Sequence, residues 1–190
     1  YDGSFYITDM FQNVMLRFDR RGSPRQVYGR SGVGPGELTA AELGFVLNDS
    51  TVAVFDARQA LVHRFDRESG KFRDARRFEA VPSFNVPFVR NDTVWMGGYA
   101  MPRRTAVAAW DLQADSIWHF GPLPLEYRQS LEGTGGYMGF LPYPVATQWE
   151  DVIVSAMSGS DQLFFLDRSG RTLDSIHIPV GRRRGFPSEA

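Results

Sequence analysis

The sequence predicts an all-β protein made of repeated strand units. Short runs of β-branched and aromatic residues alternate with polar turns along the 190 residues, as in Phe5–Asp9 and Thr51–Asp56. No segment keeps an apolar period of about 3.6 residues, so little helix is expected. A hydrophobic residue followed by aspartate recurs at 18–19, 65–66, 110–111 and 166–167, with spacings of 47, 45 and 56 residues. This recurrence predicts four repeats.

Every repeat has the same order of strands and turns. One strand leads to a second that ends in the hydrophobic-Asp pair, and the turn that follows is expected to place Asp19, Asp66, Asp111 and Asp167 equivalently. A third strand leaves that turn (Arg25–Tyr28, Phe72–Phe78, Asp115–Phe120 and Thr172–Ile178), and a fourth enters the next repeat (Leu43–Leu47, Phe84–Val89 and Gly139–Ala146).

Four strands in about 45–50 residues is the size of one β-propeller blade. The alternative is a β-sandwich, which does not require one turn motif at a fixed spacing. We therefore predict a β-propeller of four-stranded antiparallel blades, with units near 1–38, 39–80, 81–124 and 125–181, and a further blade beginning at 182–190.

Composition excludes several protein classes. A hydrophobic content of 43%, an aromatic content of 14% and a net charge of −1 argue against disorder. The 22 acidic and 21 basic residues give no bias toward nucleic acid. No apolar run approaches the roughly 18–20 residues of a membrane span. With no cysteine, disulfides, thiolate metal sites and cysteine nucleophiles are excluded.

Two segments resemble NHL-type repeats. Gly29–Leu38 resembles the glycine-rich connector between NHL blades, and Tyr6–Asp9 with Asn13 resembles the NHL strand pair, although Ala60 replaces the asparagine in the second repeat. The resemblance is good over 1–80, loose over 81–150, and returns over 151–181. It implies a six-bladed bacterial propeller that is exported to the periplasm or the exterior.

Six such blades need about 280 residues, so the chain is expected to be part of a longer propeller. The alternative is a closed four-bladed propeller resembling hemopexin-like domains, which usually close with a disulfide. An open arc would expose apolar faces and strand edges, and the isolated chain would then self-associate. The residues expected on those faces are Tyr6, Leu16, Phe18, Phe164, Leu166 and Ile176.

Few residues are candidates for a cofactor. The glycines of Gly29–Gly34 do not predict a phosphate loop, because no helix is expected behind them. His63, His119 and His177 fall in strands expected to lie away from the channel, so they are predicted to be structural rather than zinc ligands. No cofactor is therefore expected, except that the aspartate-rich turns could hold Ca²⁺.

Binding residues are expected where the repeat is broken, because long loops on rigid scaffolds carry recognition. The candidates are aromatic and arginine residues in or beside such segments: Tyr99, Arg103, Arg104, Tyr137, Tyr143, Arg182, Arg183 and Arg184. They predict a non-enzymatic module that binds an unknown protein or a small anionic ligand. The alternative, implied by related propellers, is a metal-dependent lyase or lactonase-like hydrolase with its site in the channel.

Overall fold

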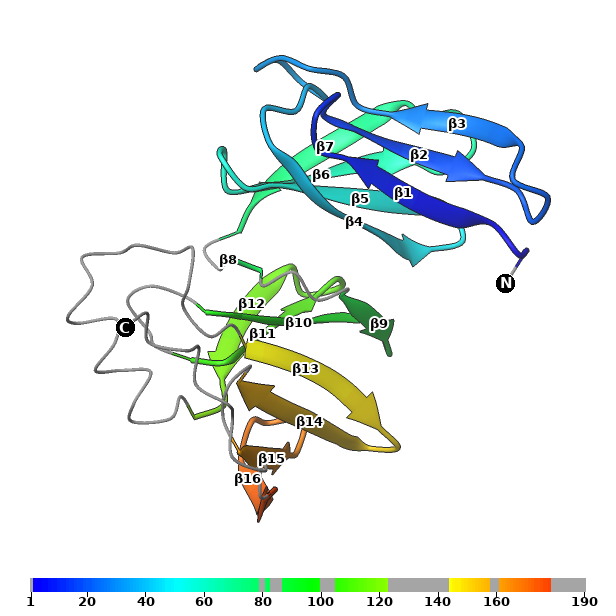
Figure 1. The fold of residues 1–190 in the computed structure, drawn as a ribbon. Helices are drawn as coiled ribbons and strands as arrows, with labels where there is room; N and C mark the ends of the chain where they lie inside the picture. Colours follow the sequence, from blue (N-terminus) through cyan, green and yellow to red (C-terminus); the bar gives the residue numbers. More distant parts are fainter. Residues whose placement is uncertain are drawn as a thin grey trace, which may run out of the picture.

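The protein is built from antiparallel sheets that follow one another along the chain. The computed structural model describes residues 2–78, 81–82, 87–99, 105–122, 144–157 and 161–178, and these residues form strands and turns but no helix. Figure 1 shows four sheets arranged along an arc, with β1–β3 at one end and β13–β16 at the other. The predicted all-β architecture is confirmed.

Each sheet is formed by strands that are consecutive in sequence. The first contains β1 (Phe5–Asp9), β2 (Val14–Phe18) and β3 (Pro24–Tyr28). The second contains β4 (Ala41–Asn48), β5 (Thr51–Asp56), β6 (Leu61–Asp66) and β7 (Phe72–Arg77). The third contains β8 (Val81–Pro82), β9 (Phe88–Arg90), β10 (Thr93–Tyr99), β11 (Val107–Asp111) and β12 (Ser116–Phe120). The fourth contains β13 (Pro144–Trp149), β14 (Val152–Met157), β15 (Gln162–Leu166) and β16 (Thr172–His177).

Two sheets do not have four described strands. The first has three, and these are the three strands that the sequence predicts around its aspartate turn. The third has five, since β8 and β9 pair with different parts of β10. The predicted strand Phe84–Val89 is represented by β9 from Phe88 onward, and residues 83–86 lie outside the described residues.

The aspartate turns occupy equivalent places in the four sheets, as predicted. Each aspartate follows or ends the second strand of the repeated unit, and one of its carboxylate oxygens accepts hydrogen bonds from backbone N–H groups two to four residues later. The acceptors are Asp19, Asp66, Asp111 and Asp167. The turn is thus set by contacts within a few residues of the aspartate.

Three apolar cores fill the spaces between neighbouring sheets. Met15 and Tyr28 of the first sheet pack with Val52 and Phe65 of the second. Similar cores join the second sheet to the third and the third to the fourth. Strand β5 is buried along its whole length, because its sheet has a neighbour on both faces.

Both end sheets leave one face uncovered in the described part of the chain. On the first sheet, Phe5, Ile7 and Val27 are 44%, 49% and 50% exposed, and Phe5 stacks on Phe18 with ring centroids 5.4 Å apart. On the fourth sheet, Ile176 is 46% exposed.

Three residues predicted for these faces lie on the opposite face. Tyr6 packs against the core shared with the second sheet, while Phe164 and Leu166 pack against the third sheet. Side chains alternate between the two faces of a strand, and these three belong to the face that a neighbouring sheet covers.

The glycine-rich connector, Gly29–Leu38, is held by hydrogen bonds to the side chain of Glu37 within it. Glu37 accepts a hydrogen bond from the backbone N–H of Gly34 at 2.8 Å and another from the Arg30 guanidinium at 2.9 Å. Gly29 has a φ of +78°, and a Cβ there would lie 2.5 Å from Leu38. These contacts describe a tight link between sheets, without a helix behind it.

His63 is buried, which differs from the predicted outer position. It is 2% exposed, neither ring nitrogen has a hydrogen-bond partner, and the ring lies 5.9 Å from that of Phe72. Burial lowers the pKa of His63 below its usual 6.5, and the Asp56 carboxylate opposes this only in part.

Stability is therefore expected to fall on mild acidification. Below about pH 6.5 the unfolded chain binds a proton at His63 that the folded chain does not, so the free energy of unfolding decreases from pH about 7.5 to about 5.5. Urea unfolding at the two pH values measures this, with His63→Leu expected to remove most of the difference. An equal loss in the variant would contradict the assignment to His63.

Candidate functional site

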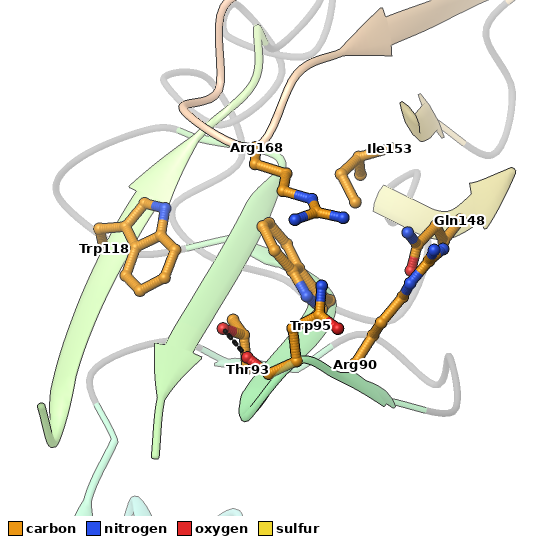
Figure 2. Close-up of a pocket in the computed structure, with 8 residues that line it drawn as sticks. Arg90, Thr93, Trp95, Trp118, Gln148, Ile153 and Arg168 are labelled. Carbon is orange, nitrogen blue, oxygen red and sulfur yellow. Dashed lines mark hydrogen bonds between the residues drawn. The ribbon is translucent and has the colours of Figure 1, made fainter. Parts of the chain in front are cut away.

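A pocket of about 150 Å³ lies between the third and fourth sheets. Its walls come from β9 and the β9–β10 turn, from β10 and β12, from β13 and β14, and from the turn after β15. The lining residues are Arg90, Asn91, Thr93, Trp95, Trp118, Gln148, Ile153 and Arg168. Figure 2 shows Trp95 between Thr93 and the guanidinium of Arg168, with Arg90 alongside Gln148.

The apolar wall of the pocket is held in place by other rings. Trp95 is 5% exposed and stacks on Phe88 with ring centroids 6.3 Å apart. It also makes edge contacts with Trp118 at 5.9 Å and Phe120 at 5.8 Å. Such a cluster presents a fixed aromatic surface to any ligand that enters.

The polar rim carries two guanidiniums and one carboxylate. Arg168 donates to Asp151 at 2.8 Å, and Arg90 lies 3.6 Å from the same oxygen. Arg90 also donates to the backbone carbonyl of Glu150. In the orientation that satisfies its amide, Asn91 accepts from both terminal nitrogens of Arg168 at 3.2 Å. The rim therefore has one excess positive charge.

The interface between the first and second sheets (the first interface) also has an arginine directly after a turn aspartate, but this arginine has other partners. Arg67 and Arg168 each follow the turn aspartate of their sheet. Arg67 donates to Asp2 at 2.8 Å and to the Tyr6 hydroxyl at 2.7 Å. Arg17 also donates to Asp2, at 2.8 Å. The hydrogen bond from the backbone N–H of Ser4, together with these guanidiniums, lowers the pKa of Asp2 to about 2, although desolvation acts in the opposite direction.

Two positions of the repeat differ between the first and third sheets at or next to the pocket. Tyr6 pairs with Arg17 across the first sheet as Trp95 pairs with Ala109 across the third, so alanine stands where the first sheet has arginine. Asp2 precedes Tyr6 by four positions, and Asn91 precedes Trp95 by the same number. The third sheet thus lacks one large side chain and one carboxylate at this place.

The interface between the second and third sheets is filled in another way. Leu112 follows the turn aspartate there, in the position of Arg67 and Arg168. Arg76 pairs with Asp115, and the guanidinium of Arg64 lies 5.7 Å from the ring centroid of Trp110. Of the three interfaces that the structure describes, the one between the third and fourth sheets therefore combines an arginine after the turn aspartate with a pocket beside it.

A second hollow of about 360 Å³ is lined mainly by apolar side chains of the third and fourth sheets. Its lining residues are Pro87, Phe88, Val145, Ala146, Thr147, Val154, Ala156 and Leu163. It offers no charged group to orient a ligand, so the smaller pocket is the better candidate site.

The binding residues predicted from sequence fall outside what the structure describes, so they stay a prediction. Tyr99 ends β10, and its side chain lies outside the description. The other candidates, Arg103, Arg104, Tyr137, Tyr143, Arg182, Arg183 and Arg184, lie outside the described residues. A signal for the pocket was present in the sequence, namely the replacement of a repeated aspartate by Asn91 and of a repeated arginine by Ala109.

Within the described ranges, no group of three His, Cys, Asp or Glu residues could hold a metal ion. The same ranges include no helix long and apolar enough to cross a membrane.

No protein-family model and no curated protein sequence matches the chain. Solved structures do match it. Virginiamycin B lyase from Staphylococcus aureus is 16% identical, over 94% of this chain and 53% of its own, with a TM-score of 0.61. The β-propeller domain of Cps50 (Swd1) from Myceliophteria thermophila is 10% identical, over 93% and 52%, with a TM-score of 0.56. A putative exported protein from Bacteroides fragilis is 14% identical, over 90% and 67%, with a TM-score of 0.52.

The chain spans about half the length of the first two structures. At these identities the likeness concerns the fold alone. It agrees with four successive antiparallel sheets arranged along an arc, and the chain therefore has the fold of consecutive β-propeller blades.

Proposed function

We propose that this chain is a non-enzymatic binding module and that the pocket between the third and fourth sheets binds a small anionic ligand. The observation that carries the proposal is a pair of guanidiniums, Arg90 and Arg168, beside an aromatic wall at a position where the repeat has lost its own carboxylate. Guanidinium groups suit carboxylate and similar oxyanions, because several N–H donors can engage one anion.

The rim is open to exchange with such a ligand. The Arg168 and Asp151 side chains are 50% and 79% exposed, so their ion pair is a surface pair that contributes about 0–1 kcal/mol. In the first interface, by contrast, Arg17 and Arg67 are 11% and 13% exposed and are held by several partners. An external anion can therefore compete for Arg168 at low cost.

Replacing Arg168 by glutamine is expected to weaken binding of a small carboxylate by at least about tenfold, since a charged hydrogen bond contributes about 1.5–3 kcal/mol. Isothermal titration calorimetry with benzoate measures the change. Arg171→Gln is the matched control, because Arg171 is 76% exposed and pairs with Asp167 away from the pocket. Equal weakening in both variants, or in neither, would contradict the proposal.

The proposal also includes the number of blades and the location of the protein. The NHL-like motifs support a six-bladed propeller that is exported, and the tyrosine and arginine residues of the long loops would then supply a further recognition surface on the protein. The alternative is a metal-dependent lyase or hydrolase. Titration with Zn²⁺ or Mg²⁺ distinguishes the two, because saturable metal binding together with turnover would favour the enzyme.

A further inference from the structure

The first interface shows how this fold holds a carboxylate between two sheets. One oxygen of Asp2 accepts from Arg17 and from Arg67, each at 2.8 Å. Its other oxygen accepts from the backbone N–H of Ser4 at 2.9 Å. A carboxyl group there is bound by guanidiniums from both sheets.

The interface between the third and fourth sheets (the third interface) has an arginine at the same position. It has no carboxylate at the position of Asp2. Arg168 occupies the position of Arg67, and the neutral amide of Asn91 occupies that of Asp2. Arg90 supplies a second guanidinium, since it and Arg168 lie 3.6 Å and 2.8 Å from the same oxygen of Asp151. The carboxylate of Asp151, on an exposed turn, would thus compete with a ligand carboxylate for the two arginines.

The pocket has aromatic walls, Trp95 and Trp118, whose rings contact each other at 5.9 Å. Ala109 pairs with Trp95 on one side and Trp118 on the other, so the side chain that would separate the two indoles is a single methyl group. A cavity of about 150 Å³ is large enough for one benzene ring.

Resting on the proposed function, we infer that the ligand is a carboxylate carried on one flat, unsaturated ring. Its carboxylate binds Arg168 and Arg90 in place of the Asp151 side chain, as Asp2 binds the arginines of the first interface. Its ring lies against Trp95 and Trp118. An uncharged ring would lack the contacts with Arg168 and Arg90. An inorganic anion would lack the contacts with Trp95 and Trp118.

Two substitutions of opposite effect test this inference by calorimetry with benzoate. Asn91→Asp restores the internal carboxylate and is expected to weaken benzoate binding at least tenfold. Asp151→Asn removes the competitor and is expected to tighten binding several-fold. The matched control is Asp49→Asn, which removes a carboxylate from the second sheet at the position that Asn91 holds in the third, and it should leave the affinity unchanged. Circular dichroism verifies that each variant is folded.

Inorganic phosphate and benzyl alcohol separate the possible outcomes. Benzoate binding well above both, with the two opposite shifts, is the expected result. If phosphate binds as tightly as benzoate and both depend on Arg168, the ring is not recognised and this inference is overturned, while the anion site stands. If neither anion binds, the proposed function itself is overturned. Equal binding of benzyl alcohol and benzoate would exclude the carboxylate contact.

Discussion

Replacing Trp110 with alanine is expected to lower the free energy of unfolding by about 3–5 kcal/mol. The indole is fully buried in the core between the second and third sheets, among Phe55, Phe78 and Met96. Its N–H donates to the carboxylate of Asp115 at 3.2 Å. The substitution leaves a large cavity and removes that donor from its acceptor. Because domains of this kind are stable by about 5–15 kcal/mol, the loss is a large share of the total.

Urea denaturation followed by circular dichroism measures this loss. Trp149→Ala is the control, because Trp149 is 62% exposed on the fourth sheet and its removal should change stability by less than about 0.5 kcal/mol. Similar losses for both tryptophans would contradict the placement of Trp110 in a core that joins two sheets.

Self-association of the 190-residue chain is the second large effect expected. The first sheet exposes Phe5, Ile7 and Val27 on one face, next to Leu16 and Phe18, and the fourth sheet exposes Ile176. Between interior sheets, such faces are covered by the next sheet. Burial of an apolar face contributes roughly 25 cal/mol per Å², so uncovered faces should associate with one another. Light scattering is expected to give at least about twice the mass of one chain.

The triple variant Ile7→Thr, Leu16→Thr and Val27→Thr is expected to reduce this association. Threonine keeps a high strand propensity while making the face polar, so the sheet itself should persist. Val33→Thr is the control, since Val33 is 82% exposed in the connector and lies on neither face. A monomer with a cooperative melt in the unmodified chain would instead favour the closed four-bladed alternative.

Local chemistry explains why much of the fold could be predicted. Alternation of apolar and polar residues sets the strands, and the turns after Phe18 and Leu166 depend on an aspartate that bonds to backbone only two to four residues away. Neither feature needs a distant part of the chain. The repeat spacing then indicates successive sheets of one kind, and the arrangement in Figure 1 agrees with it.

What the sequence by itself determined was therefore the strand pattern, the aspartate turns and the all-β class. Only the tertiary structure decided which face of each strand meets a neighbouring sheet, as Tyr6 and Leu166 show. It also decided where a pocket opens. Locally Arg67 and Arg168 are alike, since each follows a turn aspartate, but one is closed in by Asp2 and Tyr6 and the other borders a hollow. The difference arises from side chains on the adjacent sheet, far away in sequence, which pack against the arginine only after folding.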